Sequence, residues 1–218
     1  GTKDIQDWLD SKHVRRRDKK PISSLTKKHY AVIVGGMMQY AIRQKYILLN
    51  PVRPLTERGS DIVKQDQKLP EILPVNAVEQ IMAKAQNQYP ELIPVLAIGF
   101  FAGVRVGELM QLDWNCVNLS EARITISPSI AKTRSVRHIT VQPNLMQWLA
   151  PYIRPSGLIA PTKRQFRFRL NKVLKKAKVT HWPFNVMRHC FASYLFAQIQ
   201  DAAKVAFELG HRDQKMLF

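Results

Sequence analysis

The chain is poor in acidic residues. Only 16 of its 218 residues are Asp or Glu, against 34 Lys and Arg, which gives a formal net charge of +18. Such an excess of one sign predicts a polyanionic partner, with nucleic acid the first candidate and an anionic membrane surface the second. On charge alone, a basic solvated surface without a specific role is the alternative.

Cysteine and long apolar runs are also scarce. The two cysteines, Cys116 and Cys190, have no metal-ligand spacing, so we expect a reduced, cytosolic setting and no metal. The longest apolar stretch, residues 92–104, contains Pro94 and is shorter than the roughly 18 residues that a membrane span needs. No secretory signal opens the chain, and Gly1 stands close to a predicted helix without an initiating Met, which indicates an expression fragment.

The composition divides the chain into two basic blocks. Residues 56–70 are polar, with Gly59 and several charges, and are typical of a linker. We therefore expect a helical domain over residues 1–60, a linker over residues 61–69 and a second domain over residues 70–218. Since both domains are basic, they suit a clamp around a nucleic-acid duplex.

Two helices are predicted in the first domain. The second of them is expected to start at an N-cap at Ser23 or Ser24 and to end before Asn50-Pro51. The apolar face of the first helix consists of Ile5, Trp8 and Leu9. The apolar stripe of the second helix is expected to consist of Tyr30, Val34, Met37 and Ala41.

The second domain is predicted to combine helices with a small β-hairpin. Asn76 and Glu79 form a capping-box-like helix start, and Pro90 opens an apolar helix with Gly103 as its stop. Two β-like runs, residues 124–127 and 136–141, suit an antiparallel hairpin. Other helices are expected over residues 105–112, from about Thr162, and over residues 182–209 with a break near 200. The predicted fold class is therefore mainly α with a small antiparallel β-sheet (α+β).

The first pattern with chemical meaning is AGVRVGEL, residues 102–109. On a helix, Arg105 and Glu108 lie one turn apart on the same face. The carboxylate can hold the guanidinium in one orientation and leave its other N–H donors for a phosphate. An ordinary surface ion pair is the alternative.

Two further patterns carry a lysine, an arginine and a histidine. Lys132 lies in the hairpin sequence AKTRSVR, where it can donate a proton to a departing alkoxide, although basic hairpin tips are common on basic proteins. In NVMRH, Asn185 and Arg188 lie one helical turn apart. Gly210 suits a helix C-cap that places His211 just past the helix end. Taken alone, such a His is more often structural than catalytic.

These residues occur in the order and the local contexts of a known family. The chain resembles the tyrosine recombinases, or phage integrases, whose motifs are an Arg in A-G-x-R-x-x-E-L, a hairpin Lys, H-x-x-R-H and L-G-H. This sequence shows AGVRVGEL, AKTRSVRHITV, NVMRHCFASYL and ELGH. The resemblance covers nearly the whole chain. Residues 1–60 look like the helical core-binding domain of the family, and residues from about 70 look like its catalytic domain.

The resemblance implies site-specific DNA recombination or integration, by strand cleavage and rejoining through a 3′-phosphotyrosine intermediate. In that chemistry Arg105 and Arg188 hold the non-bridging oxygens of the phosphate, and Glu108 orients Arg105. Lys132 protonates the leaving 5′-oxygen, and His211 adds a hydrogen bond. No metal or other cofactor is implied.

The resemblance also implies the partners of the whole protein. These are double-stranded DNA and further copies of the chain, in a tetramer on paired recombination sites. A bacterial or phage-encoded protein in the cytoplasm fits this role.

Two departures from the family pattern stand out. Asn185 replaces the usual His, and an Asn cannot take up a proton at neutral pH, although it can donate a hydrogen bond to a phosphate oxygen. The nucleophilic Tyr of the family lies about nine residues past the His of L-G-H, whereas this sequence stops at Phe218, seven positions after His211. Tyr194 stands where the family has a packing residue and is not a credible substitute. We therefore expect this sequence to bind duplex DNA without forming a covalent adduct.

Other functions remain open on the sequence. A non-catalytic DNA-binding protein on the same fold is favoured by the two departures. A type IB topoisomerase uses a similar set of residues, and it would relax supercoils without a defined site. A basic membrane-surface protein leaves the ordered Arg, Lys, Arg and His unexplained.

Further basic residues are candidates for DNA contacts. They lie in a turn-like run before the second helix, on that helix, in the hairpin and at the start of the helix from Thr162. These residues are Arg15, Arg16, Arg17, Lys19, Lys20, Lys27, Lys28, Arg43, Arg134, Lys163 and Arg164.

Overall fold

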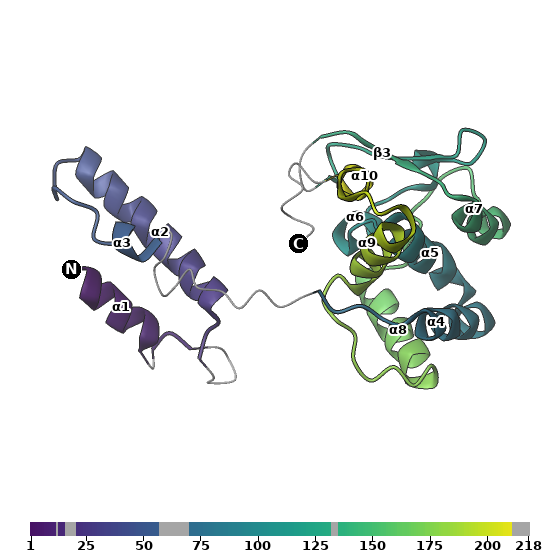
Figure 1. The fold of residues 1–218 in the computed structure, drawn as a ribbon, viewed down its shortest axis with the longest axis horizontal. Helices are drawn as coiled ribbons and strands as arrows, with labels where there is room; N and C mark the ends of the chain where they lie inside the picture. The colour runs from purple at the N-terminus through teal and green to yellow at the C-terminus, as the bar shows by residue number, and fades with distance from the viewer. Residues whose placement is uncertain (12, 16–20, 57–69, 132–134, 211–218) are drawn as a thin grey trace. The chain divides into compact units, whose positions relative to one another are not determined.

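The computed structural model describes residues 1–11, 13–15, 21–56, 70–131 and 135–210. The chain divides into two compact units, residues 1–68 and 69–218, and each is described by itself (Figure 1). The predicted linker over residues 61–69 lies outside the described residues. The predicted fold class is confirmed, since the described residues are mainly helical and include a small antiparallel sheet.

The described residues of the first unit form three helices around a small core. They are α1 (Thr2–Asp10), α2 (Ser24–Arg43) and the short α3 (Arg53–Thr56). The predicted N-cap of α2 is confirmed, because the Ser23 hydroxyl accepts a hydrogen bond from the Thr26 N–H. The buried residues of this core are Leu9, Ala31, Val52 and Leu55.

The apolar stripe predicted for α2 is right at Val34 and shifted by one residue at Tyr30 and Met37. Ala31 is buried and Val34 and Met38 pack against the core, whereas Met37 is 64% exposed. The reason is the close approach of the chain after α2. A Cβ at Gly35 would lie 3.6 Å from Val52 Cγ1, an ordinary van der Waals distance, so the face of α2 at Gly35 packs against the segment that follows the helix. The helix also ends at Arg43, well before Asn50-Pro51.

The second unit is built around an apolar central helix, α5 (Ile93–Ala102), nearly all of which is buried. It packs against α4 (Val75–Gln88), α7 (Pro143–Leu149) and α9 (Val186–Ile199) (Figure 1). The short η1 (Pro90–Leu92) leads into α5, and α6 (Val106–Leu109) follows it. The remaining helices are η2 (Trp114–Cys116), η3 (Ala150–Tyr152), α8 (Lys163–Lys176) and α10 (Ala202–Leu209).

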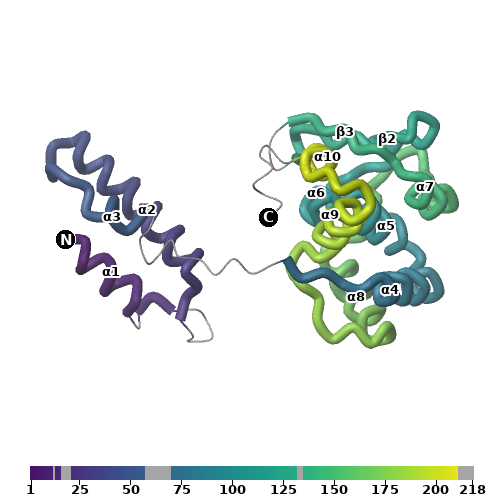
Figure 2. Tube along the Cα trace, in the orientation of Figure 1, coloured from purple at the N-terminus to yellow at the C-terminus, as the bar shows by residue number. Residues whose placement is uncertain are grey.

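The sheet of this unit is antiparallel, in the order β1 (Val117–Asn118), β2 (Arg123–Ile126) and β3 (Arg137–Thr140). The predicted hairpin of β2 and β3 is confirmed, with Ile124 opposite Ile139 and Ile126 opposite Arg137. Along β3, Arg137 and Ile139 are buried, and the residues between and after them are exposed. Helix α10 contacts both β3 and α9 (Figure 2).

Local sequence signals place most of the helix ends in this unit. Gly103 ends α5 and Gly210 ends α10, both with positive φ, as predicted. Thr162 caps α8. The start predicted at Asn76 is wrong, because α4 begins one residue earlier, after Pro74. The helix predicted from residue 182 begins only at Val186, since Asn185 has a left-handed φ of 55°.

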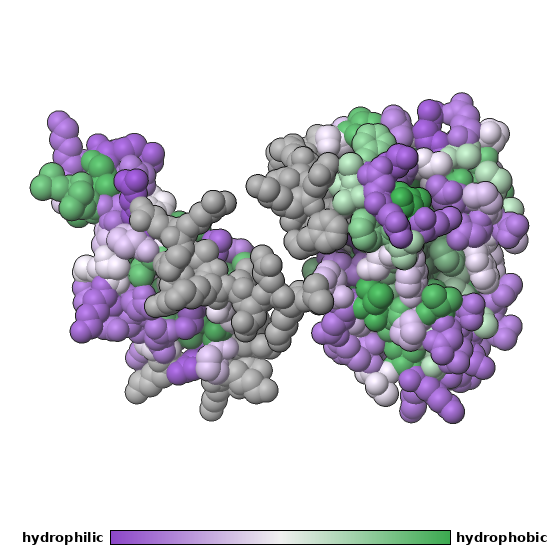
Figure 3. Space-filling model, viewed as in Figure 1, coloured by the Kyte–Doolittle hydropathy of each residue, from purple (hydrophilic) through white to green (hydrophobic). Residues whose placement is uncertain are grey.

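The surface of the described residues is mostly hydrophilic on the face drawn in Figure 3, with apolar patches between the charged side chains. None of the helices in the described ranges combines the length and the apolar character needed to cross a membrane.

Candidate functional site

Arg105 and Glu108 form the first part of the site. Arg105 is the N-cap residue of α6, directly after the left-handed turn at Gly103. Its Nη1 lies 3.0 Å from Glu108 Oε1, and its backbone N–H donates to Glu108 Oε2 at 3.2 Å. Glu108 is only 2% exposed. The predicted contact is therefore present, and it is a partly buried ion pair in which the carboxylate is almost fully buried.

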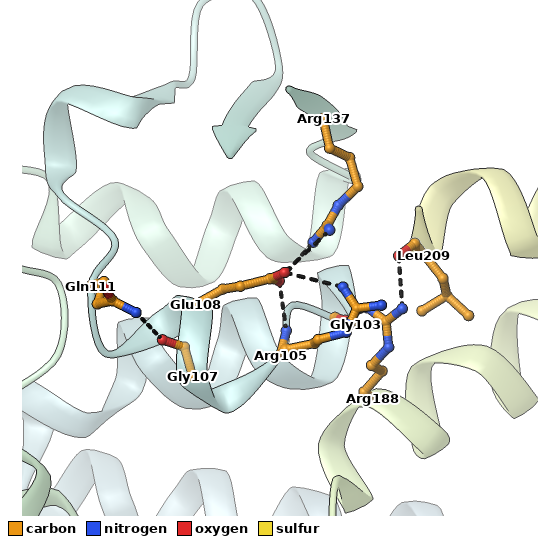
Figure 4. A network of polar contacts seen from close by, with 8 residues as sticks. All are labelled: Gly103, Arg105, Gly107, Glu108, Gln111, Arg137, Arg188 and Leu209. Atoms are coloured by element: carbon orange, nitrogen blue, oxygen red, sulfur yellow. Dashed lines mark hydrogen bonds and ion pairs between the residues drawn. The ribbon is translucent and has the colours of Figure 1, made fainter. Parts of the chain in front are cut away.

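Arg137 is a second partner of Glu108, and the sequence analysis missed it. Its Nη2 donates to Glu108 Oε2 at 2.9 Å, and its side chain is 9% exposed (Figure 4). A signal was present in the sequence. In the predicted strand over residues 136–141, strict alternation puts Arg137 on the same side as Ile139 and Val141, which are apolar and buried.

Arg188 joins the ends of two helices. It lies on α9 and is 6% exposed. Its Nη1 donates to the Gly103 carbonyl and its Nη2 to the Leu209 carbonyl, each at 2.7 Å. These carbonyls belong to the C-terminal ends of α5 and α10, where the helix dipole places partial negative charge. The guanidinium therefore fixes α5, α9 and α10 at one point (Figure 4).

Three guanidiniums and one carboxylate thus share one buried region. Burial alone would raise the pKa of Glu108, but the hydrogen bond and the charge of Arg137, followed by those of Arg105, hold it below its ordinary value. Burial, followed by the charges of Arg105 and Arg137, lowers the pKa of Arg188 to about 9. At neutral pH all four groups are charged, which leaves two net positive charges. An anion is the ligand that this arrangement favours.

Asn185 and His189 flank Arg188 on the chain. Asn185 is the half-buried N-cap residue of α9, and its side chain makes no capping bond. Asn tolerates the left-handed conformation better than most residues. Burial and the neighbouring charge of Arg188 lower the pKa of His189, so this imidazole is neutral at pH 7.

Tyr194 is engaged in packing. Its hydroxyl donates a hydrogen bond to the Leu73 carbonyl, and burial raises the pKa of Tyr194. A raised pKa leaves less of the phenolate that would act as a nucleophile. This agrees with the interpretation that Tyr194 is no substitute for a catalytic tyrosine.

The structure brings together three of the predicted site residues, Arg105, Glu108 and Arg188. Lys132 and His211 lie outside the described residues. Among the described residues, no group of three or more His, Cys, Asp or Glu side chains is placed to hold a metal ion.

The predicted DNA contacts are only partly described. Arg15, Lys163 and Arg164 are exposed, and Arg43 lies over the Tyr40 ring at 6.0 Å. Lys27 forms an ion pair with Asp10, and Lys28 is half-buried. The predicted contacts outside the described residues are Arg16, Arg17, Lys19, Lys20 and Arg134.

Comparison with known proteins gives consistent matches. The model of the phage integrase family matches residues 71–217. The chain is 26% identical over 202 residues to the tyrosine recombinase XerD of Staphylococcus saprophyticus, which covers 83% of this chain and 65% of that protein. It is 24% identical over 234 residues to the tyrosine recombinase XerC of Proteus mirabilis, which covers 95% of this chain and 73% of that protein. The chain thus spans just under two thirds of the first of these relatives.

Solved structures show the same fold. The Tn1549 transposon integrase, in complex with a circular intermediate DNA, matches with a TM-score of 0.77 at 18% identity over 99% of this chain and 79% of that chain. A lambda integrase dimer bound to a COC′ core site matches with a TM-score of 0.71 at 16% identity over 99% of this chain and 63% of that chain.

Proposed function

Because the chain belongs to the phage integrase family, we propose that it takes part in site-specific DNA recombination or integration, as a tyrosine recombinase that breaks and rejoins DNA strands. The observation that carries this proposal is the convergence of Arg105, Glu108 and Arg188, which come from segments far apart in the sequence. Two curated relatives named as tyrosine recombinases support it.

The proposed chemistry is phosphoryl transfer to a tyrosine oxygen and back to a DNA hydroxyl. The covalent 3′-phosphotyrosyl link keeps the energy of the phosphodiester, so a 5′-hydroxyl can reseal the strand without a high-energy cofactor. Negative charge builds on the non-bridging oxygens in the transition state. Arg105 and Arg188 stabilise that charge most effectively when they are already held in place before the reaction.

The structure offers a physical reason for this preorganisation. Glu108 holds Arg105 through two hydrogen bonds, one to the side chain and one to the backbone. Two helix-end carbonyls hold Arg188. Three further residues complete the proposed site. Lys132 donates a proton to the leaving 5′-oxygen, His211 donates a further hydrogen bond, and Asn185 donates a hydrogen bond to a phosphate oxygen.

The proposed partner is duplex DNA, bound by both basic units, with a tetramer on paired sites for the whole protein. The net charge of +18 supports a polyanionic partner. Exposed cations such as Lys163 and Arg164 are suited to phosphate contacts. The integrase structures that share this fold include complexes with DNA.

We expect DNA binding by the 218-residue chain to weaken steeply with salt. Each phosphate neutralised by a cation contributes about −0.9 to the slope of log affinity against log salt concentration. Fluorescence anisotropy with a labelled duplex, titrated over a range of salt concentrations, measures this slope. A flat dependence would contradict the clamp of two basic units.

Covalent capture tests the reaction itself. Bound sites are first selected from a pool of random duplexes, because the target sequence is unknown. A version of the chain that carries a tyrosine at the family spacing after His211 is then incubated with nicked duplexes of those sites. We expect a protein–DNA band on a denaturing gel, and none for the 218-residue sequence.

The outcomes separate the competing functions. A covalent band confined to selected sites supports a recombinase. Relaxation of supercoiled DNA without a defined site, by one protein acting alone, would indicate a type IB topoisomerase. DNA binding without a covalent band from the tyrosine-bearing version would indicate a non-catalytic DNA-binding protein.

A further inference from the structure

Arg137 occupies a costly position in the second unit. Its side chain is 9% exposed, and its Nε finds no hydrogen-bond partner among the described residues. A buried ion pair is often no more stabilising than well-packed apolar residues of similar volume. The stability of the fold is therefore a weak reason for an arginine at position 137. The contacts of Arg137 suggest a second reason.

The first of these contacts links Arg137 to Arg105 through a shared carboxylate. Glu108 Oε2 accepts from Arg137 Nη2 at 2.9 Å, and Glu108 Oε1 accepts from Arg105 Nη1 at 3.0 Å. Arg137 Nη1 also lies 3.5 Å from Oε1. The carboxylate is therefore held from the β3 side while it holds Arg105 on the α6 side (Figure 4).

The second contact links Arg137 to the end of α10. A Cβ at Gly210 would lie 2.4 Å from Arg137 Cδ, so the arginine side chain packs directly against the backbone of this glycine. The residue before it, Leu209, accepts the hydrogen bond from Arg188. Arg137 and Arg188 thus contact Gly210 and Leu209, the two residues that precede His211 in the sequence.

We propose that Arg137 is a positioning residue for phosphoryl transfer. It sets the orientation of Arg105 through Glu108, and it packs against the backbone of Gly210, where α10 ends. This role rests on the proposed function, and it requires no contact of Arg137 with DNA.

A dependence on pH follows from the groups that face Glu108. Among the described residues these are cations: Arg105 from α6, Arg137 from β3 and Arg188 from α9. Burial raises the pKa of Glu108, and Arg137 is the strongest of the partners that oppose this effect. Without Arg137 the pKa of Glu108 rises. The carboxylate that holds Arg105 is then present at high pH and is lost as the pH falls through the raised pKa.

The experiment compares four variants in the tyrosine-bearing version. Arg137→Met removes the guanidinium, and Arg137→Lys keeps the positive charge without the forked hydrogen-bond donors of the guanidinium. The double variant Arg137→Met with Glu108→Gln also removes the carboxylate that titrates. Arg123→Met is the matched control, because Arg123 lies on the neighbouring strand β2, is about half exposed and pairs with Glu121. Cleavage of nicked duplexes is measured from about pH 8 to about pH 5, with DNA affinity and melting temperature beside it.

We expect Arg137→Met to lower the cleavage rate by roughly tenfold to a hundredfold, the scale of a misplaced reacting group. The loss should deepen as the pH falls, and the double variant should not show this deepening. Arg137→Lys should recover part of the rate and most of the pH profile. DNA affinity should stay near that of the parent in all four variants, and Arg123→Met should cleave normally.

Other results would overturn the role. If the parent is active and Arg137→Met shows the same cleavage rate and pH profile, the positioning role is contradicted. It is also contradicted if Arg137→Met loses the same fraction of the cleavage rate at every pH and this loss follows the fall in melting temperature. If Arg137→Met does not fold, Arg137→Lys decides the question. Full activity of Arg137→Lys and a parent-like pH profile down to pH 5, together with a lowered melting temperature, would show that Arg137 is purely structural. A parent that forms no covalent product overturns the proposed function itself, and this role falls with it.

Discussion

Replacing Arg188 with alanine is expected to lower DNA cleavage by roughly a hundredfold or more in the tyrosine-bearing version, the scale for the loss of one preorganised donor. DNA affinity should fall much less, since many other basic side chains are proposed to contact the DNA backbone and each would contribute a small part. Single-turnover cleavage of nicked duplexes at saturating protein measures the rate, and anisotropy measures the affinity.

The same substitution also has a structural cost that the experiment must separate. Arg188 donates to the carbonyls of Gly103 and Leu209, and without it these acceptors lose a buried partner. Leaving a buried polar group unsatisfied costs about 1–3 kcal/mol. The rate should therefore be measured well below the melting temperature of the variant, where the folded fraction is known from circular dichroism.

An arginine of the same unit provides the control. Arg169 on α8 is partly exposed and pairs with Glu91 at 2.8 Å. Among the described residues it makes no contact with the arginine cluster around Glu108, which consists of Arg105, Arg137 and Arg188. Arg169→Ala should cleave at nearly the parent rate. Near-normal cleavage by Arg188→Ala, or an equal loss in the two variants, would contradict the role given to Arg188.

Features that depend on neighbours along the chain could be predicted from the sequence. Ser23 and Thr162 cap their helices through side-chain oxygens that reach an N–H group three residues away. Gly103 and Gly210 end helices with positive φ, which glycine adopts at less cost than residues that carry a Cβ. The pair of Arg105 and Glu108 follows from their spacing of three residues, which suits an N-cap residue and the third residue of its helix.

Features that depend on segments far apart in the sequence were missed or shifted. The contact of Arg137 with Glu108 joins a strand to a helix 29 positions away, so neither local pattern contains the partner. The inward face of α2 depends on Val52, which approaches Gly35 only in the folded unit. The family resemblance implied a phosphate contact for Arg188, and the sequence did not indicate that its guanidinium also donates to two helix-end carbonyls.

Because of these long-range contacts, the geometry of the candidate site depends on the packing of the core. Arg188 is held at the point where α5 and α10 end, and both helices end at a glycine with positive φ. Gly103 and Gly210 are therefore part of the geometry of the candidate site, although neither carries a side chain. A substitution that preserves every charged residue should still damage the site.

Gly103→Ala is the sharpest test of this connection. The residue has a φ of 61°, and an added Cβ would lie 2.5 Å from Phe191 Cδ1 and 2.9 Å from Leu209 Cδ2. The left-handed conformation costs an alanine about 1–2 kcal/mol, and overpacking in a core costs about 1–3 kcal/mol. We expect a loss of about 2–5 kcal/mol in the free energy of unfolding, measured by urea denaturation, together with slower cleavage as the Gly103 carbonyl moves away from Arg188.

Gly107→Ala, in the same motif, should behave in the opposite way. Gly107 lies within α6, is exposed, and an added Cβ would meet no atom within 4 Å. Alanine is favoured over glycine in a helix by about 0.5–1 kcal/mol, so this variant should be as stable as the parent or slightly more stable. Equal effects of the two substitutions would show that the left-handed turn before Arg105 does not hold the arginine cluster in place. A loss confined to Gly103→Ala places the origin of the site's geometry in the backbone that ends α5.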